Sequence, residues 1–167
     1  MEKLTRILIS LFLFLILTEC SPTPIEYSNK FSKLENENFT YFKGYSITYR
    51  NGVYLISNSN EKKDNERIFI KKGITGKIKN IKDIDNNSIT KSEIEIKSLE
   101  KLLDRFDKLD VSNLSVDDFQ NIQFVFFLDK CSYTFFRLSD KNSLKDMNKT
   151  YFEKYKKDWY LYKQCSE

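Results

Sequence analysis

The stretch YSITYRNGVYLIS, residues 45–57, contains two runs rich in β-branched and aromatic residues, joined by Asn51-Gly52. In the first run, from Tyr45 to Arg50, apolar and polar side chains alternate with the period of a half-buried strand. Asn-Gly is the strongest short signal for a hairpin turn, because both turn residues must accept a positive φ. The sequence therefore predicts an antiparallel hairpin over residues 45–57.

Similar runs on the C-terminal side of the hairpin predict the rest of a sheet. The run from Ile122 to Leu128 is apolar on both faces, which is typical of a strand in the middle of a sheet. Further strands are expected from the same reasoning at residues 67–71, 74–81, 133–138 and 159–162, with a short one at 93–97.

One clear helix is predicted over residues 98–109. Its apolar residues recur at helical spacing along one face, and the charged residues lie away from that face. These apolar residues are Leu99, Leu102, Leu103, Phe106 and Leu109. Ser98 is the expected N-cap. A single helical turn is expected at residues 115–119, and the ambiguous stretch 142–157 is interpreted as a second helix.

These elements predict an α+β fold. A mostly antiparallel sheet of about six or seven strands would pack against helix 98–109 and the second helix at 142–157. Residues 39–167 are expected to form a single globular domain, because no internal repeat and no second linker interrupts them. The composition, 40% hydrophobic and 31% charged residues, is that of a globular protein with a soluble surface.

The N-terminal segment has the layout of an export signal. A short charged start is followed by an apolar run from Ile7 to Leu17 and then by Thr18-Glu19-Cys20. The run is about half the roughly 20 residues that a membrane-spanning helix requires, and it fits the apolar core of a signal peptide. We therefore expect residues 1–19 to be a signal peptide.

Leu17-Thr18-Glu19-Cys20 resembles the lipobox of bacterial lipoproteins, in which an aliphatic residue stands three places before the lipidated cysteine. Glu19 departs from that pattern, since the family has a small residue there. The resemblance implies lipid on Cys20 and a membrane-anchored protein of the bacterial cell envelope, facing the periplasm or the surface. Secretion or an uncleaved anchor is the alternative if Cys20 is not lipidated.

The stretch after Cys20 is mostly polar and holds both prolines of the chain, Pro22 and Pro24. Proline-spaced polar sequence is semi-extended and buries too little surface to fold alone. We therefore expect residues 20–38 to be a flexible tether between the lipid and the domain.

Cys131 and Cys165 remain as a pair once Cys20 is assigned to lipid. An even number of cysteines in an exported protein favours a disulfide. Two free thiols are the alternative. A catalytic cysteine is not expected, because the chain has no histidine to activate one.

The absence of histidine also removes Ser-His-Asp triads and the usual zinc sites. Residues 83–88 imitate the start of a calcium loop, but Ser88 replaces the required Gly and Ile94 replaces the closing Glu. The carboxylate pairs Asp104/Asp107 and Asp117/Asp118 are interpreted as solvated surface. We therefore expect no enzyme activity, no metal and no cofactor.

A net charge of +4 with interleaved signs does not indicate a nucleic-acid partner. Aromatic residues are 15% of the chain, and the last strand places Trp159 and Leu161 on one face and Tyr160 and Tyr162 on the other. Exposed tyrosine is typical of a protein contact or a sugar-stacking surface.

The leading hypothesis is a non-enzymatic envelope lipoprotein that binds another envelope protein or envelope component. The alternatives are a module that binds a ligand or glycan through Tyr160 and Tyr162, or a protein of the immunity or inhibitor type. Packing of these two tyrosines under a helix is the structural alternative to a binding role.

Overall fold

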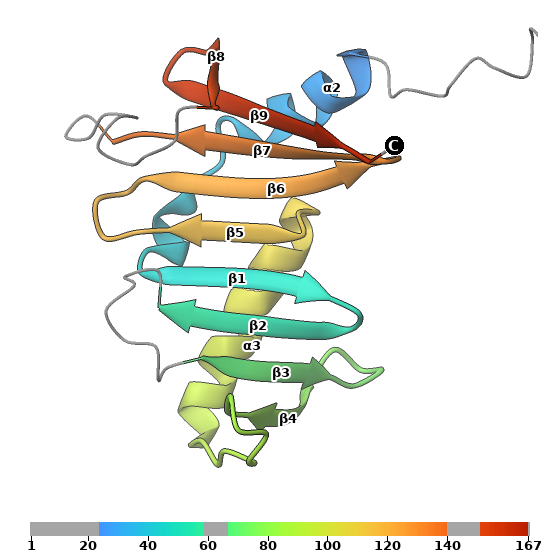
Figure 1. Cartoon of the computed structure of the whole chain (residues 1–167). Helices are drawn as coiled ribbons and strands as arrows, with labels where there is room; N and C mark the ends of the chain where they lie inside the picture. The colour runs from blue at the N-terminus through green and yellow to red at the C-terminus, as the bar shows by residue number, and fades with distance from the viewer. Residues whose placement is uncertain (1–23, 59–66, 140–150, 167) are drawn as a thin grey trace, which may run out of the picture.

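The computed structural model describes residues 24–58, 67–139 and 151–166. In this part of the chain, nine strands form one antiparallel sheet in the order β4-β3-β2-β1-β5-β6-β7-β9-β8. Two α-helices and a 3-10 turn complete the fold (Figure 1). The strands are β1 Tyr45–Arg50, β2 Val53–Asn58, β3 Ile68–Lys72, β4 Ile78–Lys82, β5 Asn113–Val116, β6 Ile122–Leu128, β7 Cys131–Arg137, β8 Glu153–Lys156 and β9 Trp159–Cys165. The helices are α2 Pro24–Leu34, η1 Phe39–Phe42 and α3 Glu93–Leu109. The expected α+β class is confirmed at this level, and the sheet is larger than predicted.

The predicted hairpin is confirmed as β1 and β2, which pair antiparallel from Arg50↔Val53 outward. Both turn residues have positive φ, 52° at Asn51 and 77° at Gly52, as an Asn-Gly turn requires. Alternate side chains of the hairpin are buried, among them Ile47. The expected position of β6 inside the sheet is also confirmed, since β6 lies between β5 and β7.

α3 begins five residues before the helix that was predicted over residues 98–109. Residues 93–97 were expected to form a strand, but they are the first turns of α3. The cause is a capping box, in which the Ser92 side chain accepts from the Glu95 backbone N–H and the Glu95 carboxylate accepts from the Ser92 N–H. Ser92 is therefore the N-cap, and Ser98 lies inside the helix.

Two other predicted helical segments are strands. The helical turn expected at 115–119 is wrong for its first half, because Ser115 and Val116 belong to β5. Leu114 and Val116 are both buried on one face of this strand, which stabilises it through tertiary packing. The helix expected at 142–157 is also wrong where it is described, because residues 153–156 form β8. Residues 142–150 lie outside the described residues.

The tether expected at 20–38 is wrong from residue 24 onward, because α2 begins at Pro24. Tyr27, Phe31 and Leu34 recur at helical spacing, and Phe31 and Leu34 are buried in the core. The ring centroid of Phe31 lies 4.5 Å from that of Phe135 on β7. Residues 24–38 therefore belong to the domain, and residues 1–23, with Cys20, lie outside the described residues.

Both helices lie on the same face of the sheet (Figure 1). α2 packs over β6, β7 and β9, where Phe31 contacts Phe124, Phe135 and Trp159. α3 packs over β1 to β3, where Phe106 contacts Tyr54. This face therefore holds the hydrophobic core. Within the described chain, no helix is long and apolar enough to cross a bilayer.

Candidate functional site: the helix-free face of the sheet

The candidate site is the side of the sheet that faces away from α2 and α3, here called the helix-free face. Alternation along the strands defines it. On β7, for example, Cys131, Tyr133 and Phe135 are buried on the helix side, and Ser132 and Thr134 point to the other side and are partly exposed. No described helix lies on the helix-free face.

The strand register arranges these side chains in rows that cross the sheet. One row runs from β3 to β9 through Phe69, Leu55, Thr48, Asn113, Val125, Thr134 and Tyr162. The neighbouring row runs from β2 to β8 through Ser57, Ser46, Ser115, Gln123, Phe136, Tyr160 and Lys154. Each row thus has polar side chains in its middle and aromatic side chains at β7 or β9.

The middle of the helix-free face carries small hydroxyl and amide side chains. Ser46 and Thr48 of β1 lie opposite Ser115 and Asn113 of β5. The Asn113 side-chain amide donates to the Thr48 hydroxyl at 2.7 Å. We call these four residues the polar band. Its donors and acceptors lie on rigid strands, which suits directional recognition of a polar ligand.

An aromatic cluster lies on one side of the polar band, on β7, β9 and the segment before β8. Its members are Phe136, Tyr151, Phe152, Tyr160 and Tyr162. The Tyr162 ring centroid lies 5.6 Å from that of Tyr151 and 5.9 Å from that of Phe152, which in turn lies 5.7 Å from Phe136. Phe136 is buried, Tyr160 and Tyr162 are half-buried and Tyr151 is 63% exposed, so part of the cluster is accessible at the surface.

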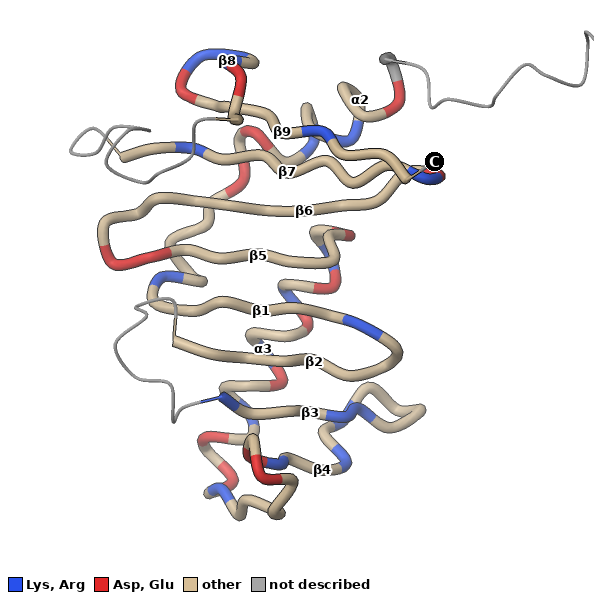
Figure 2. The backbone as a smooth tube through the Cα atoms, in the orientation of Figure 1, with Lys and Arg blue, Asp and Glu red and all other residues tan. Residues whose placement is uncertain are grey.

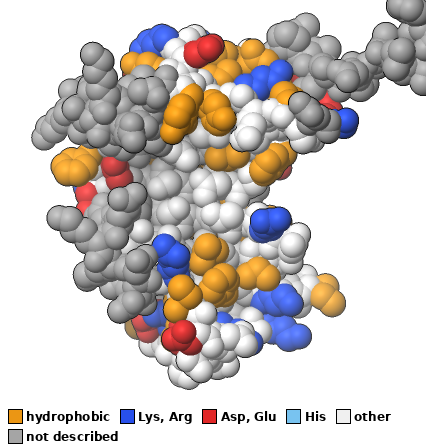
Figure 3. Space-filling view, in the orientation of Figure 1, with side chains coloured by type: hydrophobic (Ala, Val, Ile, Leu, Met, Phe, Trp, Pro, Cys, Tyr) orange, Lys and Arg blue, Asp and Glu red, His pale blue; other side chains and the backbone are white. Residues whose placement is uncertain are grey.

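A second group of apolar side chains lies on the other side of the polar band, at Val53, Leu55 and Phe69 of β2 and β3, all partly exposed. Figure 3, which looks onto the helix-free face, shows hydrophobic side chains in two groups with a band of other side chains between them. β2 and β7 are four strand spacings apart, roughly 19 Å. The face is therefore long enough for an extended ligand.

The charge of the helix-free face has one sign. Its strand positions include Arg50, Lys71, Lys82 and Lys154, and none of the described strand residues on this face is an Asp or Glu. The Lys154 ammonium lies 4.6 Å from the Tyr160 ring centroid, a cation–π contact. A neutral or anionic ligand would meet no carboxylate on these strands.

The structure places the predicted binding residues, Tyr160 and Tyr162, side by side on the helix-free face. Trp159, expected on the opposite face, is buried, and Leu161 packs against the core. The sequence reasoning missed Phe136 as a third member of the cluster, although the alternation of β7 would have placed it opposite Phe135. Tyr151 and Phe152 lie in the stretch 142–157 that was interpreted as a second helix, and the structure shows no helix at these two residues.

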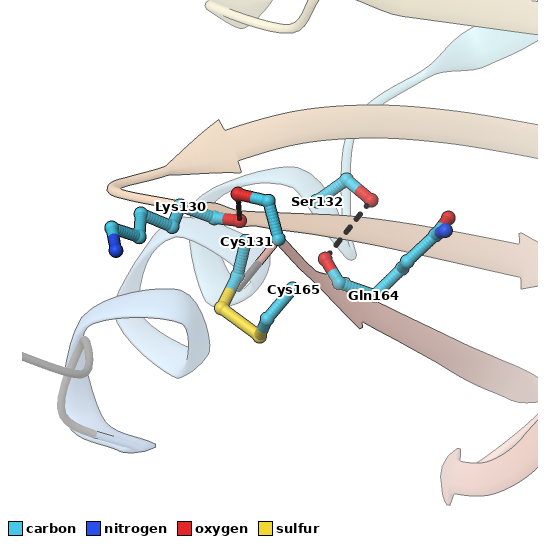
Figure 4. Close-up of a disulfide and its surroundings, with 6 residues drawn as sticks. Lys130, Cys131, Ser132, Gln164 and Cys165 are labelled. Atoms are coloured by element: carbon cyan, nitrogen blue, oxygen red, sulfur yellow. Dashed lines mark hydrogen bonds between the residues drawn. A yellow bond between two sulfur atoms is a disulfide. The ribbon is translucent and has the colours of Figure 1, made fainter.

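Cys131 and Cys165, the predicted pair, are the last cross-strand partners of β7 and β9. A disulfide joins the two residues and links β7 to β9 at this end of the strands (Figure 4). The Ser132 hydroxyl donates to the Gln164 carbonyl beside the bond. The disulfide lies on the helix side of the sheet and does not form part of the helix-free face.

Four of the carboxylates that the sequence analysis considered form hydrogen bonds or ion pairs with neighbouring residues. Asp83 accepts from the backbone N–H of Asn87 at 2.8 Å, which lowers the pKa of its carboxyl group and closes a polar turn. Asp117 accepts from the backbone and side chain of Asn121 at 2.8 and 2.6 Å. Asp104 and Asp107 bind Lys72. These contacts give each carboxylate a structural role.

An open cleft of about 870 Å³ lies elsewhere, between the first half of α3 and the ends of β1 to β3. Its floor is apolar, with Ile56, Leu99 and Leu102, and Lys91 and Glu95 lie at its edge. These two residues form an ion pair at 3.3 Å, and Glu95 is also held by the capping box. The polar groups at this edge are thus engaged in helix structure.

Comparison with known proteins shows no match to a family model, to a curated protein sequence or to a solved structure.

Proposed function

We propose that this chain is a non-enzymatic lipoprotein of the bacterial cell envelope, anchored by lipid on Cys20, whose domain binds a glycan component of the envelope on the helix-free face. The anchor is proposed from the export signal and the lipobox-like sequence of residues 17–20. The binding role is proposed from the aromatic cluster beside the polar band.

One arrangement carries the glycan proposal. Sugar rings present apolar C–H faces, which stack on aromatic rings, and hydroxyl groups, which need hydrogen-bond partners. Tyr160 and Tyr162 provide half-buried rings, and the polar band provides hydroxyl and amide groups on rigid strands. The rows of the register place both kinds of group on one face, so a polymeric ligand would contact them together.

The test is calorimetric titration of the full chain with oligosaccharides released from purified cell wall by muramidase digestion. We expect Tyr160→Ala and Tyr162→Ala each to weaken binding about tenfold, because a lost aromatic contact costs on the order of 1 kcal/mol. Tyr45→Ala is the matched control, since Tyr45 is 41% exposed but points to the helix side. Equal affinities for all four proteins, or no binding at all, would refute the glycan proposal.

A protein partner is the second candidate, favoured by the tyrosines of the same surface, because interface hot spots are enriched in tyrosine. Crosslinking in intact cells distinguishes the two candidates. A crosslinked protein that is recovered with the parent chain and lost with Tyr162→Ala would favour the protein partner. Tyr45→Ala again serves as the control.

A further inference from the structure

The start of α2 lies at the end of the sheet where β7 begins. Tyr27 of its first turn stacks on Tyr133 near the start of β7, with ring centroids 4.8 Å apart. Lys30, one turn later, binds Asp110 at 2.7 Å and lies 5.0 Å from the ring centroid of Phe126. The register places the β1–β2, β3–β4 and β6–β7 turns at this same end (Figure 1).

The distance from this end to the proposed anchor is short. Four peptide units join Cys20 to Pro24, and a fully extended chain of that length spans at most roughly 14 Å. A lipid on Cys20 therefore holds the start of α2, and the β6–β7 turn beside it, close to the membrane, and the other two turns lie at the same end of the strands. We propose that the rim formed by the β1–β2, β3–β4 and β6–β7 turns lies on an anionic membrane surface, an inference that rests on the proposed lipid anchor.

The rim presents apolar side chains that the fold leaves uncovered. Ile74 in the β3–β4 turn is fully exposed, and Phe127 near the end of β6 is 62% exposed. Tyr49 at the end of β1 is 43% exposed. Large exposed apolar side chains in turns and at the ends of strands are suited to the boundary between headgroups and acyl chains, where part of each side chain leaves water.

The rim is also basic. Arg50, Lys71 and Lys130 are exposed, and within the described ranges none of them pairs with a carboxylate. Figure 2 shows basic residues at the ends of β1 and β3 and at the β6–β7 turn. Asp129 is the acidic residue of the β6–β7 turn, next to Lys130. Free cations at a membrane-proximal edge are attracted to anionic lipid headgroups.

The opposite end of the strands offers a control position for the rim. The β5–β6 turn there contains Asp117 and Asp118 together with Phe119, which is 63% exposed. Phe119 therefore matches Phe127 in residue type and exposure, but it lies at the other end of the strands. This pair allows orientation to be measured on one protein.

The experiment uses the full lipidated chain in vesicles of phosphatidylethanolamine and phosphatidylglycerol, part of which carry brominated acyl chains. Ile74→Trp, Phe127→Trp and Phe119→Trp are compared by tryptophan fluorescence. The native Trp159 is 2% exposed and contributes the same background to each variant. We expect brominated lipid to quench the new indole of Ile74→Trp and Phe127→Trp at least twofold more than that of Phe119→Trp.

The lipid anchor, the position of the rim and the role of the cations are tested separately. Intact mass and vesicle flotation, compared with Cys20→Ala, test the anchor itself, and an unmodified protein that does not float overturns both the anchor and the rim. A lipidated, floating protein with no quenching in Ile74→Trp and Phe127→Trp overturns the rim and leaves the anchor. Equal quenching in Phe119→Trp also overturns the rim. Unchanged quenching of the Ile74→Trp indole when Arg50→Gln/Lys71→Gln/Lys130→Gln is added to that variant overturns the role of the cations.

Discussion

Lys72 shows how one side chain joins the sheet to a helix. Its ammonium donates to Asp104 at 2.7 Å and to Asp107 at 2.9 Å, both on α3, and the Tyr54 hydroxyl donates to the same Asp107 at 2.8 Å. Burial alone would lower the pKa of Lys72, but the two carboxylates outweigh it and raise the pKa. Burial and the bond to Asp107 raise the pKa of Tyr54. This network fixes α3 over β2 and β3.

The Glu95 carboxylate of the capping box makes part of the protein's stability depend on pH. Hydrogen bonds from the Ser92 hydroxyl and backbone N–H, with Lys91 nearby, lower the pKa of its carboxyl group to about 2 from 4.5. Because the folded pKa is below the unfolded one, the stabilisation is complete above about pH 4.5 and is lost as the pH falls toward 2. We expect Glu95→Gln to flatten this acid-dependent part of stability, measured as the urea midpoint from pH 7 to pH 2.5.

Glu93→Gln is the control for Glu95→Gln, since it removes a carboxylate from the same helical turn but leaves the capping box intact. It should keep the loss of stability between pH 4.5 and 2. If Glu95→Gln shows the same pH dependence as the parent protein, the capping box does not act in solution as the structure implies.

At the scale of single elements, α2 changes the account of the N-terminal region. The polar and proline-containing sequence around it is typical of a tether. Of its described side chains, Tyr27, Phe31 and Leu34 pack against the core. Those side chains are sufficient because they enter an aromatic core: Phe31 lies within 4.5 to 5.5 Å of the ring centroids of Phe135, Tyr155 and Trp159. Tertiary packing thus stabilises a helix whose own sequence is a weak helix former.

Phe31→Ala tests this packing. Removal of a buried phenylalanine leaves a cavity, so we expect a loss of about 3 to 5 kcal/mol in the free energy of unfolding, measured by urea denaturation. Ser32→Ala, at the next and exposed position, should change the stability by less than about 0.5 kcal/mol. A tether would respond equally weakly to both substitutions, and that result would show that α2 does not dock on the sheet.

The two edge strands of the sheet are protected against pairing with a strand of another chain. β4 and β8 are the edge strands, of five and four residues. Each carries two lysines, Lys79 and Lys82 on β4 and Lys154 and Lys156 on β8. Short, lysine-bearing edges discourage the addition of a further strand from another chain. This favours recognition through the helix-free face over recognition by strand pairing.

At the scale of the whole molecule, the disulfide joins the last strand to β7. Cys131 and Cys165 are separated by 34 residues, and the bond between them restricts the unfolded chain. The strand that it secures, β9, carries Tyr160 and Tyr162 and also supports β8. The covalent link therefore stabilises the aromatic cluster, although it lies on the other face.

Removal of this link by Cys131→Ser/Cys165→Ser is expected to lower the free energy of unfolding by roughly 3 to 4 kcal/mol, from loop-closure entropy alone. The measurement is urea denaturation with and without a reducing agent. The parent protein should lose the same amount on reduction, and the double variant should not respond to the reducing agent. A parent protein insensitive to reduction would show that the bond adds no stability.

Local sequence patterns were enough to predict the hairpin at 45–57, the mostly antiparallel α+β class and which side chains share a face on the predicted strands. These depend on local features: an Asn-Gly turn, period-two alternation and helical spacing. They did not determine the state of residues 93–97 and 153–156, because a short apolar pattern fits a helix or a strand and long-range contacts choose between them.

Long-range packing determines which face of the sheet holds the core and which face is left without a described helix. Alternation shows that Tyr160 and Tyr162 share one face and that Trp159 lies on the other, but it does not say which face the helices cover. That choice is made by α2 and α3 docking on the same side of the sheet, through contacts such as Phe31 with Trp159 that span more than a hundred residues. Local periodicity assigns residues to faces, whereas burial of a face is a property of the whole assembled chain.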